Sequence, residues 1–200
     1  MRQNWFLEKD LIISNKYQKH FYDISRKFVD EHKDLLSKGK VLVVGHGLGC
    51  KAFFINKINK NVKSIDIELL ANAVLKEKVV LYKGDTMPFK DNEFDVVVCA
   101  HVLHHTATPK KLFSEMVRVC KKKIIIVEEL HSNILGKMAS VLNCCIKNKL
   151  ANQKASIYWG SYFSESAFES LIKEHCLVVK EKRERKKFEF SAFTYILEKI

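Results

Sequence analysis

The chain has 200 residues, of which 47% are hydrophobic, and this is enough apolar material for one domain with a continuous core. No stretch approaches the roughly 18–20 apolar residues of a membrane span, and residues 1–20 carry charges throughout, so neither a transmembrane segment nor a secretory signal is expected. The formal charge of +12 permits binding to RNA or to acidic metabolites, but the basic residues are scattered along the chain, with one dense run at 180–187.

The cysteines indicate a reducing compartment. No two of them form a Cys-x-x-Cys pair, and most fall inside apolar runs. We therefore expect reduced, buried thiols in a cytoplasmic protein, with neither disulfides nor metal ligands. The six are Cys50, Cys99, Cys120, Cys144, Cys145 and Cys176.

Residues 1–38 are predicted to form an N-terminal helical segment, because Phe21, Ile24 and Phe28 recur at helical spacing. Short, β-branched runs then alternate with helical patterns. The runs at 40–44, 62–65, 79–82, 94–99 and 123–127 are typical of parallel strands covered on both faces. Two final strands, near 177–181 and 188–197, read as a hairpin whose connection is the basic run.

Helix boundaries between these runs are readable. Thr108 and Pro109 suit the N-cap and first-turn positions of one helix. Ser164 can cap another, with Phe163 packed against Phe168. The pattern predicts an α/β fold with a doubly wound, Rossmann-like sheet of seven strands, mostly parallel with an antiparallel last strand, and helices on both faces. One domain spans residues 1–200.

A glycine-rich turn ends the first of the parallel strands. Gly45, Gly47 and Gly49 lie within five residues, directly after the run 41–44. Glycine allows positive φ and lets a ligand lie against the main chain, and the amides of the following helix favour a polar or anionic ligand. Asp66 ends the next strand, where its carboxylate can accept hydrogen bonds from both hydroxyls of a ribose or can cap a helix.

A third motif begins at Gly84-Asp85, continues through Pro88-Phe89 and runs from Phe94-Asp-Val-Val to the paired histidines His104 and His105. In combination with the glycine turn, this order resembles the class I methyltransferases, and most of all the small-molecule branch called methyltransferase type 11. The resemblance covers about residues 41–128.

This resemblance implies an enzyme that takes a methyl group from S-adenosyl-L-methionine. Asp66 matches the ribose ligand, and Asp85, with Thr86 and Met87, matches the segment that reads the adenine ring. The full set of implied cofactor residues is Gly45, His46, Gly47, Gly49, Asp66, Ile67, Asp85, Thr86, Met87, Ala100 and His101. Val43 stands where the family usually has an acidic residue. A dehydrogenase fits less well, because the third glycine comes one residue early for Gly-x-Gly-x-x-Gly.

The residues do not single out a catalytic group. Methyl transfer is an in-line displacement that needs a general base only for a protonated acceptor. His101, His104 and His105, with Glu128 and Glu129 at the end of the fifth strand, are the candidates, each with an alternative structural role.

Residues 132–160 are predicted as a helical insertion. Its apolar face includes Leu135, Met138 and Leu142, and it would act either as a lid over the acceptor or as an ordinary amphipathic helix on the sheet. Tyr158, Trp159 and Tyr162 could line an apolar pocket there, and Tyr17 and Tyr22 of the N-terminal helix could form a second lid. We expect a small-molecule or lipid-like acceptor. An RNA methyltransferase using the basic surface and a non-catalytic member of the fold remain open alternatives, and the oligomeric state is not predicted.

Overall fold

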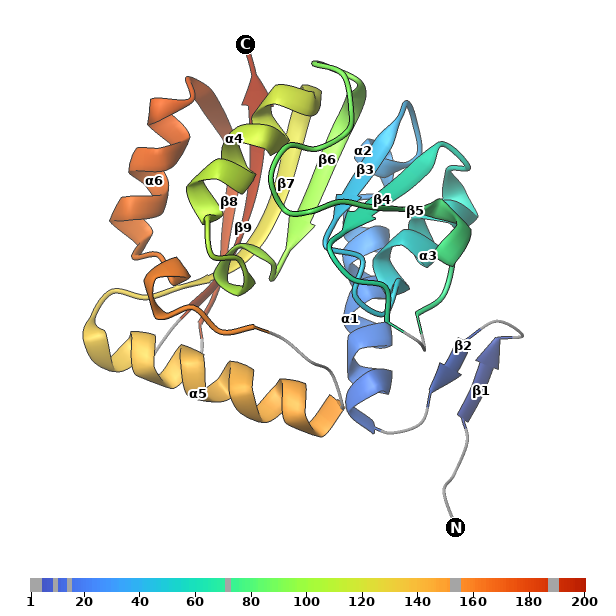
Figure 1. Ribbon diagram of the computed structural model, residues 1–200, viewed down its shortest axis with the longest axis horizontal. Helices are drawn as coiled ribbons and strands as arrows, with labels where there is room; N and C mark the ends of the chain where they lie inside the picture. Colours follow the sequence, from blue (N-terminus) through green and yellow to red (C-terminus); the bar gives the residue numbers. More distant parts are fainter. Residues whose placement is uncertain (1–4, 9–10, 14–15, 71–72, 152–155, 187–190) are drawn as a thin grey trace.

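The computed structural model describes residues 5–8, 11–13, 16–70, 73–151, 156–186 and 191–200. One seven-stranded sheet dominates it, in the order β5-β4-β3-β6-β7-β9-β8 (Figure 1). Neighbours from β5 to β7 are parallel, whereas β9 is antiparallel to both β7 and β8. The strands are β3 (Val41–Val44), β4 (Val62–Asp66), β5 (Val79–Leu81), β6 (Phe94–Ala100), β7 (Cys120–Leu130), β8 (Leu177–Lys186) and β9 (Ser191–Lys199). The predicted doubly wound fold is confirmed.

Helices cover both faces of the sheet. On one face, α1 (Lys16–Glu31), α2 (Lys33–Leu36) and α3 (Cys50–Ile58) pack on Val41 and Val43. On the other face, α4 (Pro109–Val119) and α6 (Glu165–Glu174) pack on Leu42 and Val44. Successive side chains of a strand point to opposite faces, so the continuous apolar run 41–44 supplies both cores. Short 3₁₀ helices lie at η1 (Lys76–Lys78), η2 (Leu103–His105) and η3 (Trp159–Ser161).

The predicted helix boundaries hold in part. Ser164 caps α6 by accepting a hydrogen bond from the Ala167 amide at 3.1 Å, and the Phe163 and Phe168 rings lie 5.9 Å apart. Pro109 begins α4, but the Thr108 side chain makes no capping bond.

Two segments differ from the sequence prediction. Residues Trp5–Glu8 (β1) and Leu11–Ile13 (β2) form a small antiparallel pair, although we expected helix from the start of the chain. The basic run also lies mostly on β8, which continues to Lys186, rather than in the hairpin connection. An edge strand tolerates such residues because its side chains reach solvent and charge there opposes aggregation.

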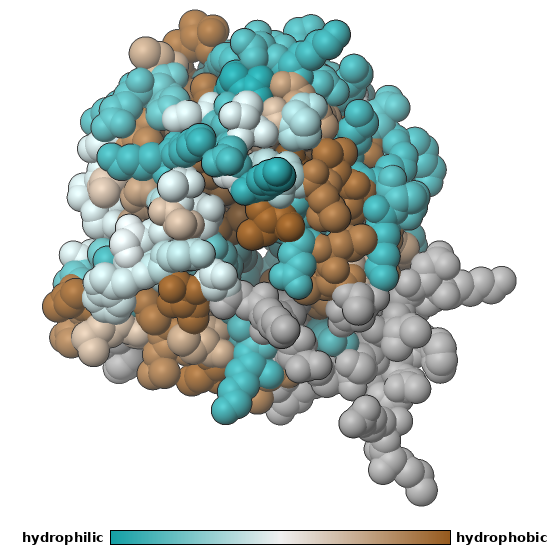
Figure 2. All heavy atoms as spheres, viewed as in Figure 1, coloured by the Kyte–Doolittle hydropathy of each residue, from teal (hydrophilic) through white to brown (hydrophobic). Residues whose placement is uncertain are grey.

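Helix α5 (Ile134–Ala151) runs across the end of the sheet where the parallel strands finish (Figure 1). Its apolar side faces solvent: Leu135 is 64% exposed and Leu142 is 60% exposed. Figure 2 shows these hydrophobic side chains gathered over α5 at the lower left of the view. The side turned toward the protein instead carries Ser140 and Cys144, which are buried.

Candidate functional site

The glycine turn connects β3 to α3, and each of its glycines has a positive φ, of 77°, 52° and 81° in chain order. A Cβ on Gly45 would lie 2.3 Å from the Val102 side chain, and one on Gly49 would lie 2.4 Å from the Val74 carbonyl oxygen. A Cβ on Gly47 would meet no atom within 4 Å. Gly45 and Gly49 are therefore needed for packing, whereas Gly47 faces open space.

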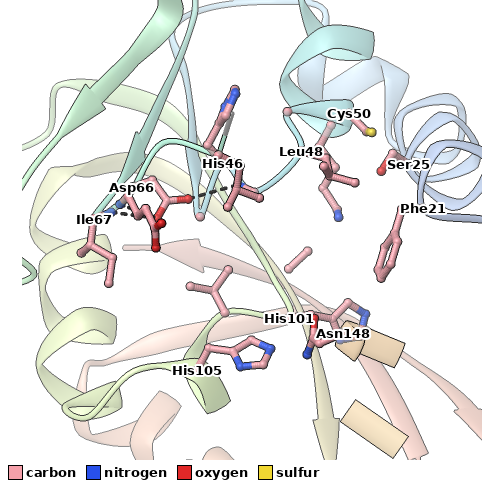
Figure 3. Close-up of a pocket in the computed structure, with 18 of the residues that line it drawn as sticks. Phe21, Ser25, His46, Leu48, Cys50, Asp66, Ile67, His101, His105 and Asn148 are labelled. Atoms are coloured by element: carbon pink, nitrogen blue, oxygen red, sulfur yellow. Dashed lines mark hydrogen bonds between the residues drawn. The ribbon is translucent and has the colours of Figure 1, made fainter. Parts of the chain in front are cut away.

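Asp66 joins this turn to the end of β4. Its carboxylate accepts hydrogen bonds from the Gly47 amide at 3.0 Å and the Ile67 amide at 2.7 Å (Figure 3). Val43, at the position where the resembling family has an acid, is buried in the core. The Asp66 carboxylate thus organises the turn by hydrogen bonding. The alternative role as a helix cap is not seen, because no helix begins at Asp66.

His46 has a structural role in the turn. Its Nε2 lies 2.8 Å from the Val74 carbonyl oxygen, and the residue is buried. Burial lowers the pKa of this imidazole, against the opposing effect of the Val74 hydrogen bond. A neutral ring whose Nε2–H donates to Val74 satisfies this geometry, and it fixes the loop beside the turn.

A cavity of about 280 Å³ opens at the turn, at the point where strand order reverses between β3 and β6. In Figure 3, Asp66 and Ile67 stand on one side of it, and Phe21 and Ser25 of α1 stand on the opposite side. Eight of the predicted cofactor residues line it: Gly45, His46, Gly47, Gly49, Asp66, Ile67, Ala100 and His101.

The three remaining predicted residues do not line this cavity. Asp85 and Thr86 are exposed, and Asp85 pairs with Lys111 at 3.3 Å. Met87 is 1% exposed inside the core, and its amide donates to Glu115 at 2.7 Å. Arg118 ion-pairs with the same Glu115 and donates to the Met87 carbonyl. These contacts give the segment 85–87 a structural function in the unliganded protein.

Several lining residues were not predicted, because they come from segments distant in sequence. Phe21, Ile24 and Ser25 lie on α1, and Asn148 lies on α5. Tyr22, which was predicted to belong to a lid, instead packs in the core against Phe54, with the rings 4.7 Å apart. The side chain of Tyr17, the other predicted lid residue, lies outside the part of the chain that the structure describes. The helical spacing of α1 was the available signal, but it does not reveal which face meets the cavity.

Lys51 is the most informative addition. It sits in the first turn of α3, and burial lowers the pKa of its ammonium group. No carboxylate among the described residues pairs with it, and it lines the cavity. A desolvated cation without a counter-ion is costly, so this position favours an anionic group on a ligand.

A second cavity, of about 460 Å³, adjoins the first, and both are lined by Phe21, Ile24, Lys51, Ala100, His101, His105 and Asn148. Most residues in its remaining wall have charged or polar side chains, among them Lys27, Glu31, Glu129, Lys147 and Arg183. Leu135, Leu142, Tyr158, Trp159 and Tyr162 line neither cavity. The structure therefore places none of these residues at either cavity, and an apolar acceptor pocket formed by them stays a prediction.

Buried ionisable groups lie at the wall of this second cavity. The Glu128 carboxylate, 1% exposed, bonds to His104 Nδ1 and accepts from the Leu103 and Glu129 amides, each at 3.1 Å. Burial opposes the charged form of His104, but Glu128 raises the pKa of the imidazole above its usual value. Burial would also raise the pKa of the Cys144 thiol, yet hydrogen bonds with His104 and His105 lower it to about 6.

Residues 42–127 match the model of a methyltransferase domain, called type 11. Two uncharacterised proteins of Methanocaldococcus jannaschii are similar: one is 32% identical over 138 residues, and the other is 36% identical over 93. These matches cover 67% and 46% of this chain but only 60% and 41% of the relatives, so the chain spans about half the length of the proteins it matches.

Solved structures show the same fold. Magnesium protoporphyrin IX methyltransferase of Synechocystis, with bound S-adenosylhomocysteine, is 14% identical with a TM-score of 0.62, over 92% of this chain and 84% of that one. Geranyl diphosphate C-methyltransferase of Streptomyces coelicolor is 10% identical with a TM-score of 0.66, over 92% and 81%. An S-adenosylmethionine-dependent methyltransferase of Aquifex aeolicus is 17% identical with a TM-score of 0.61, over 91% and 96%. Residues 42–127 thus match the type 11 methyltransferase domain, within a chain that has the class I methyltransferase fold.

Proposed function

We propose that this protein transfers a methyl group from S-adenosyl-L-methionine to a small polar acceptor. The observation that carries the proposal is the pair of adjoining cavities, one at the glycine turn and one behind it, with seven lining residues in common. A shared wall of this kind lets a methyl group pass between two ligands held end to end. Methyl transfer depends mostly on such alignment in a site that excludes water.

The residues of the first cavity fit this cofactor. The open space above Gly47 leaves room for the ligand against the main chain, and Asp66 presents carboxylate oxygens to ribose hydroxyls. Lys51 can pair with the carboxylate of the methionine end, which satisfies its buried charge. The cofactor supplies an electrophilic methyl group on a sulfonium. The chain holds it by these contacts, with Phe21 and Ile24 shielding the site from solvent.

The second cavity favours a polar acceptor over a lipid-like one. Its basic side chains are Lys27, Lys51, Lys147, Arg183 and Arg185, against the acids Glu31, Glu129 and Glu184. This balance suits an acceptor with an anionic group. His101 and His105 line both cavities, and His101 is placed to take a proton from an acceptor, because both ring nitrogens of His105 already face Ser156 and Cys144.

The basic run gives little support to RNA as the acceptor. Lys182 pairs with Glu165 and Glu169, at 2.5 and 2.7 Å, and Lys180 pairs with Glu198 at 3.0 Å. Charges neutralised in this way release fewer counter-ions from a phosphate backbone. Arg183 and Arg185 also line the second cavity, so their substitution would affect either class of acceptor.

The test is methyl transfer from labelled S-adenosylmethionine to a low-molecular-mass extract and, separately, to total RNA. We expect label in the small-molecule fraction. Thr194→Trp fills the second cavity without touching the first, so it should abolish turnover while cofactor affinity stays unchanged. Leu142→Trp, on the exposed side of α5, is the matched control and should be active. Label only in RNA, or full activity of Thr194→Trp, would contradict the proposal.

A further inference from the structure

Three side chains that can bind a metal ion converge at the wall of the second cavity. Their ligand atoms all lie within 4.8 Å of one another: one ring nitrogen of His104, one ring nitrogen of His105, and Cys144 Sγ. The histidines belong to η2 and the cysteine to α5, and all three residues line the cavity. Two imidazoles and one thiolate are the ligand types that Zn²⁺ prefers.

The rings are held so that lone pairs point inward. Nδ1 of His105 lies 2.8 Å from the Ser156 carbonyl oxygen, which can only accept, so Nδ1 keeps its proton. Nε2 lies 3.5 Å from Cys144 Sγ, where it can exchange a proton for a metal ion. Nδ1 of His104 is held by the Glu128 carboxylate in the same way, which leaves Nε2 for a ligand. A carboxylate or carbonyl on the outer nitrogen is the usual second shell of a metal-bound histidine.

Distances and charges are also suitable. Zn–S of about 2.3 Å and Zn–N of about 2.0 Å in a tetrahedron place sulfur and nitrogen about 3.5 Å apart. Cys144 Sγ and His105 Nε2 are separated by 3.5 Å. The Asn148 amide donates to the same sulfur at 3.1 Å. A divalent cation would balance one thiolate and the buried Glu128 carboxylate, which leaves no net charge in this part of the core.

The buried Tyr162 hydroxyl lies beside this cluster. Its ring is 5.0 Å from that of His104, and its oxygen is placed to hydrogen-bond with the Cys144 side chain. Tyr162 therefore adds a polar group beside the sulfur of the cluster.

We propose that His104, His105 and Cys144 bind one Zn²⁺ ion whose fourth coordination position opens into the second cavity. Three protein ligands and an open position are the pattern of a zinc site that binds substrate. Building on the proposed function, the ion would hold the nucleophilic oxygen or sulfur of the acceptor, whose proton passes to solvent on binding. Sequence analysis predicted no metal site here, because Cys144 lies 40 and 39 residues from the two histidines, far outside any zinc-ligand motif.

The test is metal binding by the full chain. Protein stripped with a chelator should bind one equivalent of Zn²⁺ in competition with a chromophoric chelator, and Co²⁺ in its place should give a thiolate-to-cobalt absorption band. Cys144→Ser should lose the band and bind Zn²⁺ at least about 10–100-fold more weakly. Cys145→Ser, at the exposed neighbouring position, is the matched control and should retain both. His105→Gln should weaken binding by a similar factor.

Circular dichroism would confirm that each variant is folded, and S-adenosylhomocysteine binding would do so for Cys144→Ser and Cys145→Ser, because the first cavity includes His105 but neither cysteine. The readouts of Cys144→Ser therefore also separate this inference from the proposed function. No Co²⁺ band in the unmodified protein, or a band that survives Cys144→Ser, would overturn the zinc site. In both cases normal S-adenosylhomocysteine binding would leave the methyltransferase proposal standing.

Discussion

Replacement of Gly47 by valine is expected to abolish cofactor binding while changing the stability of the fold only slightly. A side chain at this position meets no protein atom within 4 Å, so it clashes with nothing in the unliganded protein. The residue has a φ of 52°, and the left-handed conformation costs an L-residue about 1–2 kcal/mol. In a chain of this size, that cost lowers the melting temperature by roughly 2–8 °C.

The expected effect on binding is much larger. S-adenosylhomocysteine at 100 times its dissociation constant stabilises a protein by about 2.7 kcal/mol, which for the unmodified chain is a rise of roughly 5–11 °C in melting temperature. The introduced valine side chain would fill the space of the ligand, so Gly47→Val should show no rise at the same concentration. Thermal unfolding with and without S-adenosylhomocysteine measures both effects.

Two other glycines serve as controls. Gly160→Ala also meets no atom within 4 Å, has no positive φ and lies outside both cavities, so it should unfold and bind as the unmodified protein does. Gly45→Ala meets Val102 at 2.3 Å and should destabilise the fold itself. A ligand-induced rise in Gly47→Val equal to that of the unmodified protein would refute the placement of the cofactor.

Further substitutions test the other contacts. Asp66→Ala removes charge-assisted hydrogen bonds and should weaken cofactor binding by about 1.5–3 kcal/mol in a calorimetric titration. Asp85→Ala changes an exposed residue outside the cavity and should bind the cofactor normally. Equal losses of cofactor affinity in the two variants would restore Asp85 to the site. Lys51→Met should weaken cofactor binding about tenfold or more, because it removes the cation proposed to pair with the cofactor carboxylate. It should not lower the melting temperature, because a desolvated cation is costly to the fold. Unchanged cofactor affinity would show that Lys51 does not contact the cofactor. Leu135→Asp should leave turnover intact, since this side chain faces solvent, and a severe loss of turnover would show that α5 turns its apolar side inward during the reaction.

Local patterns predicted the sheet and the turn. The run 41–44 is continuously apolar because both faces of β3 are buried. Glycine is required at positions 45 and 49 by their positive φ and by the close approach of Val102 and Val74. The order of these elements is enough to place Asp66 beside the turn. Such features depend on residues near one another in sequence or at neighbouring strand ends.

The acceptor side depends on tertiary packing and was not predictable in this way. The pattern of α5 favours burial of Leu135 and Leu142, whereas Ser140 and Cys144 are buried because Glu129 and His105 provide polar partners on that side. Met87 matches a family position, but its burial follows from the core and from Glu115. Sequence spacing carries no information about contacts of this kind.

No helix among the described residues is long and apolar enough to cross a membrane. The exposed apolar side chains of α5 lie on the opposite side of that helix from the residues that line the second cavity. Substitutions on this surface can be used as controls for those that line the cavity.

Calorimetric titration of the purified chain with S-adenosylmethionine tests the central claim most directly. Asp66, Lys51 and the open space at Gly47 predict saturable binding at one site per chain. We expect micromolar affinity, on the order of −7 to −8 kcal/mol, accompanied by a rise in melting temperature. Absence of both heat and thermal stabilisation at millimolar cofactor would contradict the account and would identify the chain as a non-catalytic member of the fold.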